Sequence, residues 1–196
     1  MTQARLLLPI SCVVALLAGC GTATAADITA GKGTAEGCAG CHGSDGISHT
    51  PLMPSLAGEP DEFVQWQLVY YRSGTRKNEV MGPIAESLNN EEIRNLGAYY
   101  ASLAPPKPES APDAFAESGE KLALQHRCKS CHGEDYSGFR AAARLSDQRE
   151  DVLLNALRDF KTGKRISNGV ASMADVTYDL TDDDMKALAH YMATRP

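Results

Sequence analysis

The chain of 196 residues has few aromatic side chains, no excess of positive charge and no long apolar run beyond residue 19. Lys and Arg number 19 against 25 Asp and Glu, and the resulting net charge of −6 has the wrong sign for a nucleic-acid binder. After residue 19, no apolar stretch is long enough to span a bilayer. Hydrophobic residues still make up 43% of the chain and charged residues 22%, so disorder throughout is excluded.

A proline-rich segment near the middle of the chain indicates two domains. Residues 104–112 include four prolines and should be extended and semi-rigid. We expect an export signal at residues 1–26 and domains at residues 27–103 and 113–196. Each domain has about 80 residues, a size at which side chains alone build a marginal core and a staple or a cofactor is usually needed. The six cysteines are then the most informative residues.

The first 26 residues have the layout of a bacterial export signal. Arg5 precedes an apolar stretch at residues 6–17, and small residues follow. Two processing routes stay open: residues 17–20 resemble a lipoprotein signal in which Cys20 receives lipid, whereas residues 23–26 offer cleavage sites that release a soluble chain. Either route predicts a periplasmic protein, soluble or anchored to a membrane face. In that oxidising compartment, idle cysteine pairs would become disulfides.

The chain repeats itself with a period of about 90 residues. Cys38-Ala39-Gly40-Cys41-His42 recurs as Cys128-Lys129-Ser130-Cys131-His132, and residues 56–76 align without gaps on residues 145–165. An internal repeat of this length indicates two domains built on one plan.

That plan is predicted to be all-α, because helix start and stop signals recur and no sustained two-residue alternation is present. The start signals are Pro60-Asp61-Glu62, Asn89 and the capping-box residues 181–184, and Gly74 is typical of a helix end. We also expect helices at residues 30–37 and 116–127, leading into the two cysteine motifs.

Each Cys-x-x-Cys-His motif has the spacing of a c-type haem attachment site. Two thiols three positions apart on a helical turn can add across the two vinyl groups of a haem, and the next histidine then faces the iron. A zinc site would need cysteines from separate halves to converge, and a thioredoxin-like site would need a βαβ pattern. Disulfides would leave both histidines unexplained. We therefore predict two haem c groups, attached through Cys38, Cys41, Cys128 and Cys131, with iron ligands His42 and His132.

Methionine is the expected second axial ligand, because its thioether closes the sixth position of the iron and raises the reduction potential. Met81 and Met173 each follow the middle helix of their half, where a loop can fold across the far face of the haem. Met53 lies soon after His42, in a loop expected to cover the histidine side. We expect structural roles for the remaining candidates, which are Met185, Met192, His49, His126 and His190.

Two further interpretations concern the side chains around the haems. Trp66 falls at helical spacing and is expected to pack in the core or against a haem. Arg76 and Arg165 hold matching places after a helix end, where they either pair with haem propionates or are solvated.

With both haem motifs, residues 54–58 (PSLAG) and Met81-Gly82-Pro83, the sequence resembles dihaem cytochromes of the cytochrome c4 type. The resemblance covers nearly all of residues 27–196. It implies two class-I cytochrome c domains, each a small helical shell around one covalently bound haem, with the helices at its two ends crossing. It also implies that the Pro54 carbonyl accepts the hydrogen bond that orients His42.

The second half departs from this pattern, and we expect unequal haems. Ala143 stands where Pro54 stands in the first half, so its carbonyl can accept the same bond without the fixed φ of proline. The net charge is −5 for residues 27–103 but −2 from residue 104 onward. Positive charge near an iron favours its reduced state, so the second haem is expected to have the higher potential.

A haem with protein ligands on both faces has no open position for substrate, so we expect an electron-transfer protein rather than an enzyme. The first hypothesis is a carrier between a quinol-oxidising complex and a terminal oxidase or reductase. The alternative is a cytochrome subunit of a periplasmic dehydrogenase complex, and a dihaem peroxidase is less favoured. Because the chain is acidic, redox partners with basic docking patches are expected. Nucleic acid is not expected, and membrane contact would come only through lipid on Cys20.

Overall fold

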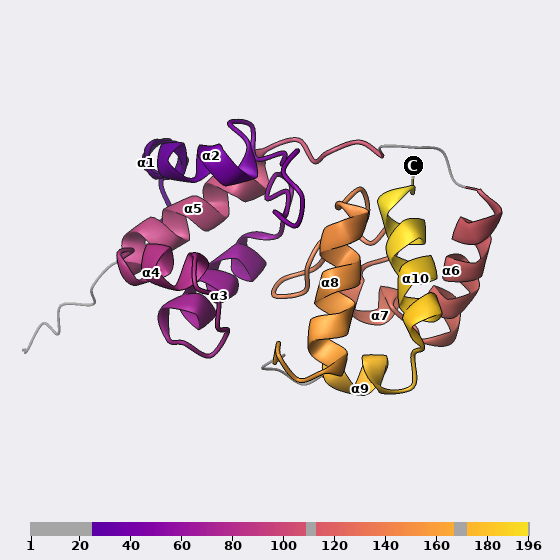
Figure 1. Cartoon of the computed structure of the whole chain (residues 1–196). Coiled ribbons are helices and arrows are strands. Elements are labelled where there is room, and N and C mark those ends of the chain that lie inside the picture. The colour runs from indigo at the N-terminus through magenta and orange to yellow at the C-terminus, as the bar shows by residue number, and fades with distance from the viewer. Residues whose placement is uncertain (1–24, 109–112, 167–171, 196) are drawn as a thin grey trace, which may run out of the picture.

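The computed structural model describes residues 25–108, 113–166 and 172–195. These ranges hold helices joined by irregular segments, with one isolated bridge between Phe139 and Ala142 and no strand (Figure 1). The expected all-α class is therefore confirmed. The predicted export signal lies outside the described residues except for Ala25 and Ala26, and Cys20 lies outside them as well. None of the described helices is both long and apolar enough to cross a membrane.

The two halves contain the same series of helices, which confirms the repeat. The first half consists of α1 (Ile28–Ala35), the 3-10 turn η1 (Glu36–Cys38), α2 (Ala39–His42), α3 (Asp61–Arg72), α4 (Met81–Glu86) and α5 (Asn90–Ser102). The second half consists of α6 (Ala114–Gln125), α7 (Lys129–His132), α8 (Glu150–Lys161), α9 (Met173–Tyr178) and α10 (Asp182–Ala193).

Side-chain caps explain where α1, α5, α6 and α10 begin. Thr181 forms the expected capping box of α10, in which the cap side chain and the third helical residue bond each other's backbone N–H groups. Asn89, expected only as a helix start, forms a capping box of the same kind at α5. The helices leading into the cysteine motifs begin two residues earlier than expected. Asp27 and Asp113 cap them, each accepting hydrogen bonds from two backbone N–H groups of the first turn.

The first and last helices of each half cross closely, α1 on α5 and α6 on α10. Glycine makes this approach possible: a Cβ on Gly31 would overlap the carbonyl oxygen of Asn95, and a Cβ on Gly119 would overlap that of Ala187. Helix α3 packs on α5 and α8 packs on α10, while the short α4 and α9 lie against α3 and α8. The helical shell implied by the resemblance is thus present in both halves.

Each half has its own hydrophobic core, formed by the inner faces of these helices. Val64, Leu68 and Leu96 are buried in the first. Met185 and Met192 are buried in the second, which is the structural role expected for them. Trp66 is not a core residue: it is 47% exposed and stacks on Tyr70, so that part of the expectation is wrong.

We predict that Gly31→Ala destabilises the first half, because a methyl group cannot enter the α1–α5 crossing without moving backbone. The expected cost is about 1–3 kcal/mol of unfolding free energy. Gly33→Ala, in the same helix, is the matched control, because nothing lies within 4 Å of its Cβ position. It should stabilise by up to about 1 kcal/mol through helix propensity. Thermal and denaturant unfolding of the haem-loaded protein measure both; equal stabilities would contradict the close crossing.

Candidate haem sites

Both cysteine motifs lie on short helical turns that lead from the core to the surface. Cys38 ends η1 and Cys41 lies in α2, and the second motif continues from Cys128 into α7. Cys38 and Cys128 are half-buried, whereas Cys41 and Cys131 are exposed. None of these four cysteines forms a disulfide bond, which argues against the disulfide alternative. They also do not gather into a zinc-type site, since no cluster of three or more metal-binding side chains occurs among the described residues.

Each motif histidine is held by a backbone carbonyl from the loop that follows it. The Nδ1 atom of His42 lies 2.9 Å from the Pro54 oxygen, and that of His132 lies 2.8 Å from the Ala143 oxygen. A carbonyl can only accept, so Nδ1 carries the proton and Nε2 keeps its lone pair. Burial lowers the pKa of both histidines and favours this neutral form. The donor set therefore fits a group whose iron is bound by Nε2.

The two predicted methionines hold equivalent positions, as the first residues of α4 and α9. The Asn78 side chain accepts the backbone N–H groups of Val80 and Met81, which turns the chain into α4. The Met81 side chain is partly buried against the first core. Met173 is half-buried, and residues 167–171 before it lie outside the described residues.

The alternative candidates occupy different surroundings. Met53 immediately precedes Pro54, whose carbonyl binds His42, and so belongs to the loop on the histidine side as expected. His49 is exposed in that loop, and His126 is the residue at which α6 ends. His190 lies in a gap between two carboxylates: its Nδ1 is 2.9 Å from Glu150, and its Nε2 is 3.3 Å from Asp113.

Arg76 and Arg165 are brought together where the two halves meet. Both guanidinium groups bind the Gln67 side-chain oxygen, at 2.6 and 3.1 Å, and each lies 4.6 Å from the centre of an aromatic ring of its own half. Burial and the neighbouring Arg76 charge lower the pKa of Arg165 to about 9. The alternative of solvated arginines is therefore wrong, because both guanidinium groups are buried from solvent.

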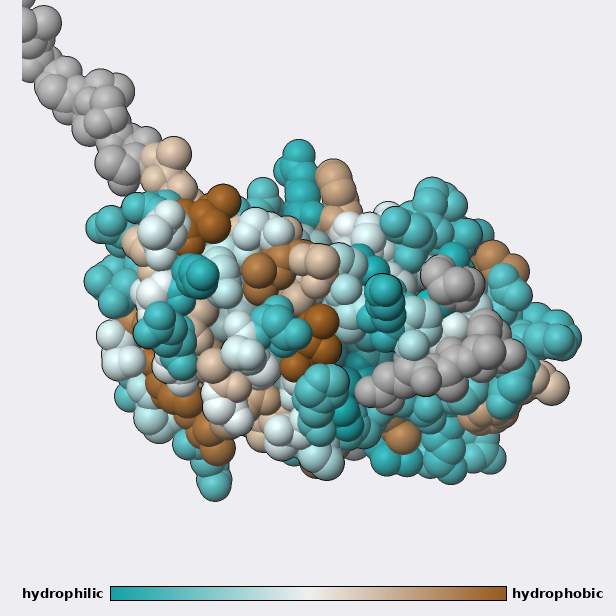
Figure 2. Space-filling view, turned by 90° about the horizontal axis from the view of Figure 1, so that it is seen from above, coloured by the Kyte–Doolittle hydropathy of each residue, from teal (hydrophilic) through white to brown (hydrophobic). Residues whose placement is uncertain are grey.

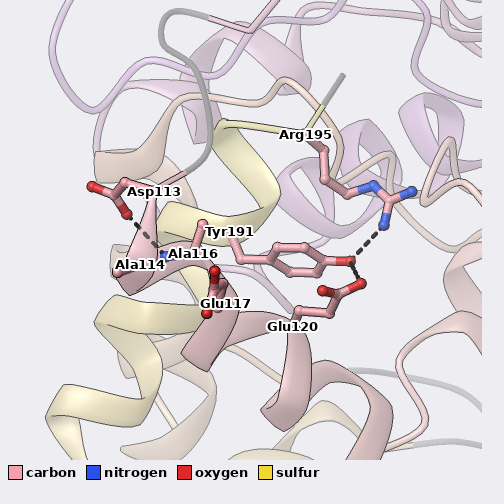
Figure 3. A pocket seen from close by; sticks show the side chains of 7 residues that line it. All are labelled: Asp113, Ala114, Ala116, Glu117, Glu120, Tyr191 and Arg195. Carbon is pink, nitrogen blue, oxygen red and sulfur yellow. Dashed lines mark hydrogen bonds between the residues drawn. The ribbon is translucent and has the colours of Figure 1, made fainter.

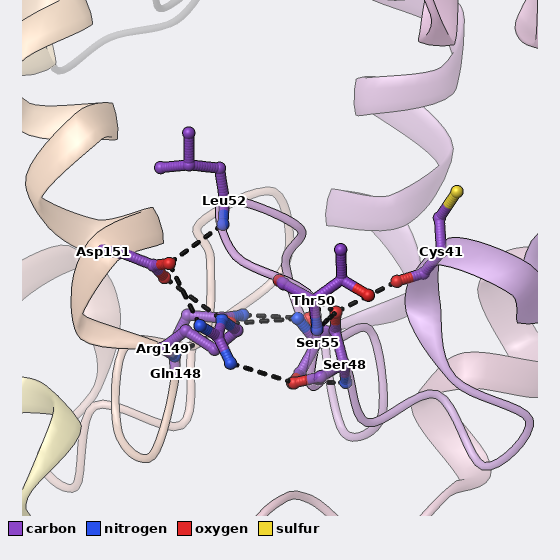
Figure 4. Close-up of polar contacts among 8 residues, drawn as sticks. All are labelled: Cys41, Ser48, Thr50, Leu52, Ser55, Gln148, Arg149 and Asp151. Atoms are coloured by element: carbon purple, nitrogen blue, oxygen red, sulfur yellow. Dashed lines mark hydrogen bonds and ion pairs between the residues drawn. The ribbon is translucent and has the colours of Figure 1, made fainter.

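Backbone groups of two loops make the rest of this contact. Figure 4 shows Ser55 exchanging two hydrogen bonds with the Gln148 side chain, N–H to Oε1 at 3.0 Å and Nε2–H to O at 2.9 Å. The Leu52 N–H donates to Asp151 at 2.9 Å. In the mirror arrangement, the Arg144 N–H donates to Glu59 Oε2 at 2.9 Å. Sequence reasoning missed this interface, although the alignment of residues 56–76 with 145–165 places Glu59 opposite Gln148.

A hollow of about 450 Å³ lies elsewhere, between α6 and α10. Figure 3 shows Tyr191 at its centre, accepting a 2.5 Å hydrogen bond from Arg195 and donating to Glu120 at 3.4 Å. None of the predicted haem residues lines it.

The cytochrome c family model matches residues 28–104 and again residues 116–196, one match to each half. The chain belongs to the cytochrome c4 family of dihaem cytochromes. Cytochrome c4 of Thiocapsa roseopersicina is 32% identical over 177 residues, covering 85% of this chain and 91% of that protein. The crystal structure of reduced cytochrome c4 from Pseudomonas stutzeri gives a TM-score of 0.80 at 28% identity, covering 88% of this chain and all of that one.

A second group of relatives carries another name. The thiosulfate dehydrogenase electron acceptor of Thiomonas intermedia is 31% identical, covering 83% of this chain and 80% of that protein. The structure of thiosulfate dehydrogenase from Marichromatium purpuratum gives a TM-score of 0.76 at 32% identity, and the match covers 87% of this chain but only 40% of that one. The family and the two motifs mean that this protein carries two covalently bound haem c groups.

We predict that His190 stabilises the second half at low pH. The hydrogen bond to Glu150 raises the pKa of His190 above its ordinary value, and Asp113 adds to the effect. Its contribution is therefore complete below about pH 6.5 and is lost as the pH rises through the raised value. In a His190→Gln variant, the unfolding free energy should no longer fall as the pH rises through this range. In the control variant His49→Gln, at an exposed position, it should still fall. Denaturant unfolding across pH 5–9, about the range where histidine titrates, is the measurement.

Proposed function

We propose that the protein is a periplasmic carrier of single electrons, with domains at residues 27–103 and 113–196. The haems are attached through Cys38, Cys41, Cys128 and Cys131, and the axial pairs are His42 with Met81 and His132 with Met173. The observation that carries this proposal is the hydrogen bond from each histidine Nδ1 to a carbonyl, because it leaves Nε2 free in both halves. When bound, each haem supplies an iron that accepts and releases one electron.

The surrounding residues hold the site rather than take part in bond making. The carbonyls of Pro54 and Ala143 orient the histidine rings, and the half-buried methionines lie where α4 and α9 begin. The exposed Cys41 and Cys131 bring one edge of each attachment site to the surface, where a redox partner can approach. Such an arrangement favours electron transfer without a substrate-binding position.

Redox partners with basic docking patches suit the negative net charge of the chain. The chain carries a net charge of −6, and haem propionates add negative charge. Figure 2 shows apolar side chains gathered over the half that begins at the N-terminus, while the other half is mostly hydrophilic on the same face. We propose a quinol-oxidising complex as donor and a terminal oxidase or reductase as acceptor. Binding to such partners should weaken as ionic strength rises.

The second candidate function is electron acceptance from a dehydrogenase. The relatives named as electron acceptors of thiosulfate dehydrogenase favour it, because they match over most of both chains. Purification of the natively exported protein separates the two functions. A stable complex with a dehydrogenase in fixed stoichiometry supports the subunit role, whereas a free dihaem protein that is reduced by a quinol-oxidising complex supports the carrier role.

We predict that Met81→Ala and Met173→Ala each open one haem to carbon monoxide. The reduced wild-type protein should bind almost none at neutral pH, because both iron faces are taken. Each variant should bind one carbon monoxide per chain, measured from the Soret band. Met185→Leu, in the second core, is the matched control and should bind none. Substantial binding by the wild-type protein would instead support the peroxidase alternative.

Arg76 and Arg165 provide a concentrated positive charge that suits the propionates of the haems. Both are half-buried, and burial lowers the pKa of each, so an anion nearby would stabilise their charged forms. We predict that Arg76→Gln lowers the reduction potential of the first haem, because positive charge near an iron favours its reduced state. Arg94→Gln, exposed on α5, is the control. Spectroelectrochemical titration that finds the Arg76 variant unchanged would remove this role.

A further inference from the structure

One peptide group in each half carries two hydrogen bonds that point in opposite directions. The Ala143–Arg144 peptide accepts from His132 Nδ1 through its carbonyl, at 2.8 Å, and donates to Glu59 Oε2 through its N–H, at 2.9 Å. The Pro54–Ser55 peptide accepts from His42 at 2.9 Å and donates to Gln148 Oε1 at 3.0 Å. Each histidine is thus connected, through a single peptide group, to a side chain of the other half.

The two connections match in geometry, but only the side chain at the end of one of them can ionise. Gln148 is an amide and cannot ionise, whereas Glu59, its counterpart in the aligned repeat, is a carboxylic acid. Both side chains are almost fully buried, with 4% exposure for Glu59 and 6% for Gln148. The sequence difference therefore places a buried carboxyl group in the contact between the halves, where the other repeat has a neutral amide.

We propose that Glu59 controls the reduction potential of the second haem across the contact between the halves, by acting through the Ala143–Arg144 peptide on His132. A carboxylate at the N–H end polarises the peptide and makes its carbonyl a stronger acceptor. The His132 ring then carries more negative charge and stabilises the oxidised iron. A neutral carboxylic acid has the weaker effect, so the potential is higher when Glu59 is protonated. Glu59 is a positioning and tuning residue, because it acts through another group.

The surroundings of Glu59 set the pH at which this control operates. Burial raises the pKa of the carboxyl group to about 8. The facing groups that lower it are the backbone N–H and the charge of Arg144, the charge of Arg165 and the side chain of Gln148. In the facing loop, the Asp147 carboxylate is bound to the Arg144 guanidinium at 3.1 Å, and local hydrogen bonds and, to a smaller extent, the same guanidinium charge lower the pKa of Asp135. Glu59 is therefore mostly protonated at neutral pH and ionises in mildly alkaline solution.

The coupling between electron and proton is balanced. Where Glu59 titrates, it takes up at most one proton from solvent for each electron that a redox donor delivers to the second haem. Oxidation by the acceptor releases both, the electron to the partner and the proton to water. Linkage is reciprocal, so a potential that falls with rising pH and a carboxyl pKa that rises on reduction describe the same coupling.

The proposal rests on the proposed ligation by His132 and is tested with the haem-loaded protein. Potentials of the two haems are measured by spectroelectrochemistry between about pH 6 and pH 10, a range that brackets the raised carboxyl pKa. Haem methyl NMR signals assign each potential to its domain. We expect the potential of the second haem to fall as the pH rises through about 8 and that of the first to stay constant over this step. Glu59→Gln should remove the step and hold the second haem at its low-pH value.

The matched variant is Gln148→Glu, which places a carboxylic acid on the peptide connected to His42. It should transfer the effect, so that the potential of the first haem now falls with rising pH. Suppose that Glu59→Gln removes the pH step from the second haem but Gln148→Glu does not produce one at the first haem. That result would overturn the peptide connection. Equal shifts of both haems in Glu59→Gln would overturn it too, because they indicate an effect of charge through space.

A spectroscopic measurement on the wild-type protein does not depend on either variant folding. In the reduced, diamagnetic protein, the NMR shift of the His132 Nδ1 proton should titrate together with the Glu59 carboxyl carbon, while the His42 Nδ1 proton should not. A His132 proton that ignores the Glu59 titration overturns the inference and leaves the electron-carrier function intact. Failure of the proposed function would give a different result: the haems would bind carbon monoxide or would lack histidine ligands.

Discussion

The hydrogen bond from each histidine Nδ1 to a loop carbonyl is the contact on which both haem sites depend. It fixes the tautomer and orientation of the ring, and it connects the cysteine helix to the loop that precedes α3 or α8. The loop is held in turn from both sides. In the first half, Leu56 and Ala57 bond back to Gly46, and Gly58 bonds to Tyr100 at the end of α5. The crossing helices thereby position a carbonyl that belongs to no helix.

The contact between the halves uses the same two loops, so the sites and the interface are not separate features. A peptide group that orients a histidine with its carbonyl presents its N–H to the other half. Duplication of one domain makes this relation reciprocal, because the residue five positions after Pro54 or Ala143 reaches the corresponding loop of its partner. Small differences between the repeats then have large consequences. Proline at position 54 stiffens its loop, whereas Ala143 leaves the matching loop less constrained. Glu59 gives its half a group that can ionise, whereas Gln148 cannot.

The haem motifs, the helical class and the helix starts at Asn89 and Thr181 could be predicted from the sequence because each depends on residues close together in the chain. Cys38, Cys41 and His42 have a fixed spacing, and Asn89 and Thr181 lie directly before the helices they cap. The interface could not be predicted in this way. Its bonds join Ser55 to Gln148 and Glu59 to the backbone of Arg144, across more than eighty residues and partly through backbone groups that leave no pattern in the sequence.

A buried carboxyl group in the interface is an unfavourable choice if stability is the only requirement. The mirror position shows the alternative, because Gln148 satisfies the backbone of the other half with a neutral amide. Ionised Glu59 loses its hydration, and the backbone N–H that it accepts, together with the nearby Arg144 and Arg165 charges, offsets only part of that loss, which is why its pKa is raised. Groups that break a local rule at a cost in stability are concentrated at functional sites. Glu59 lies one peptide group away from His132, so the carboxyl group that lowers stability is placed where it can act on electron transfer.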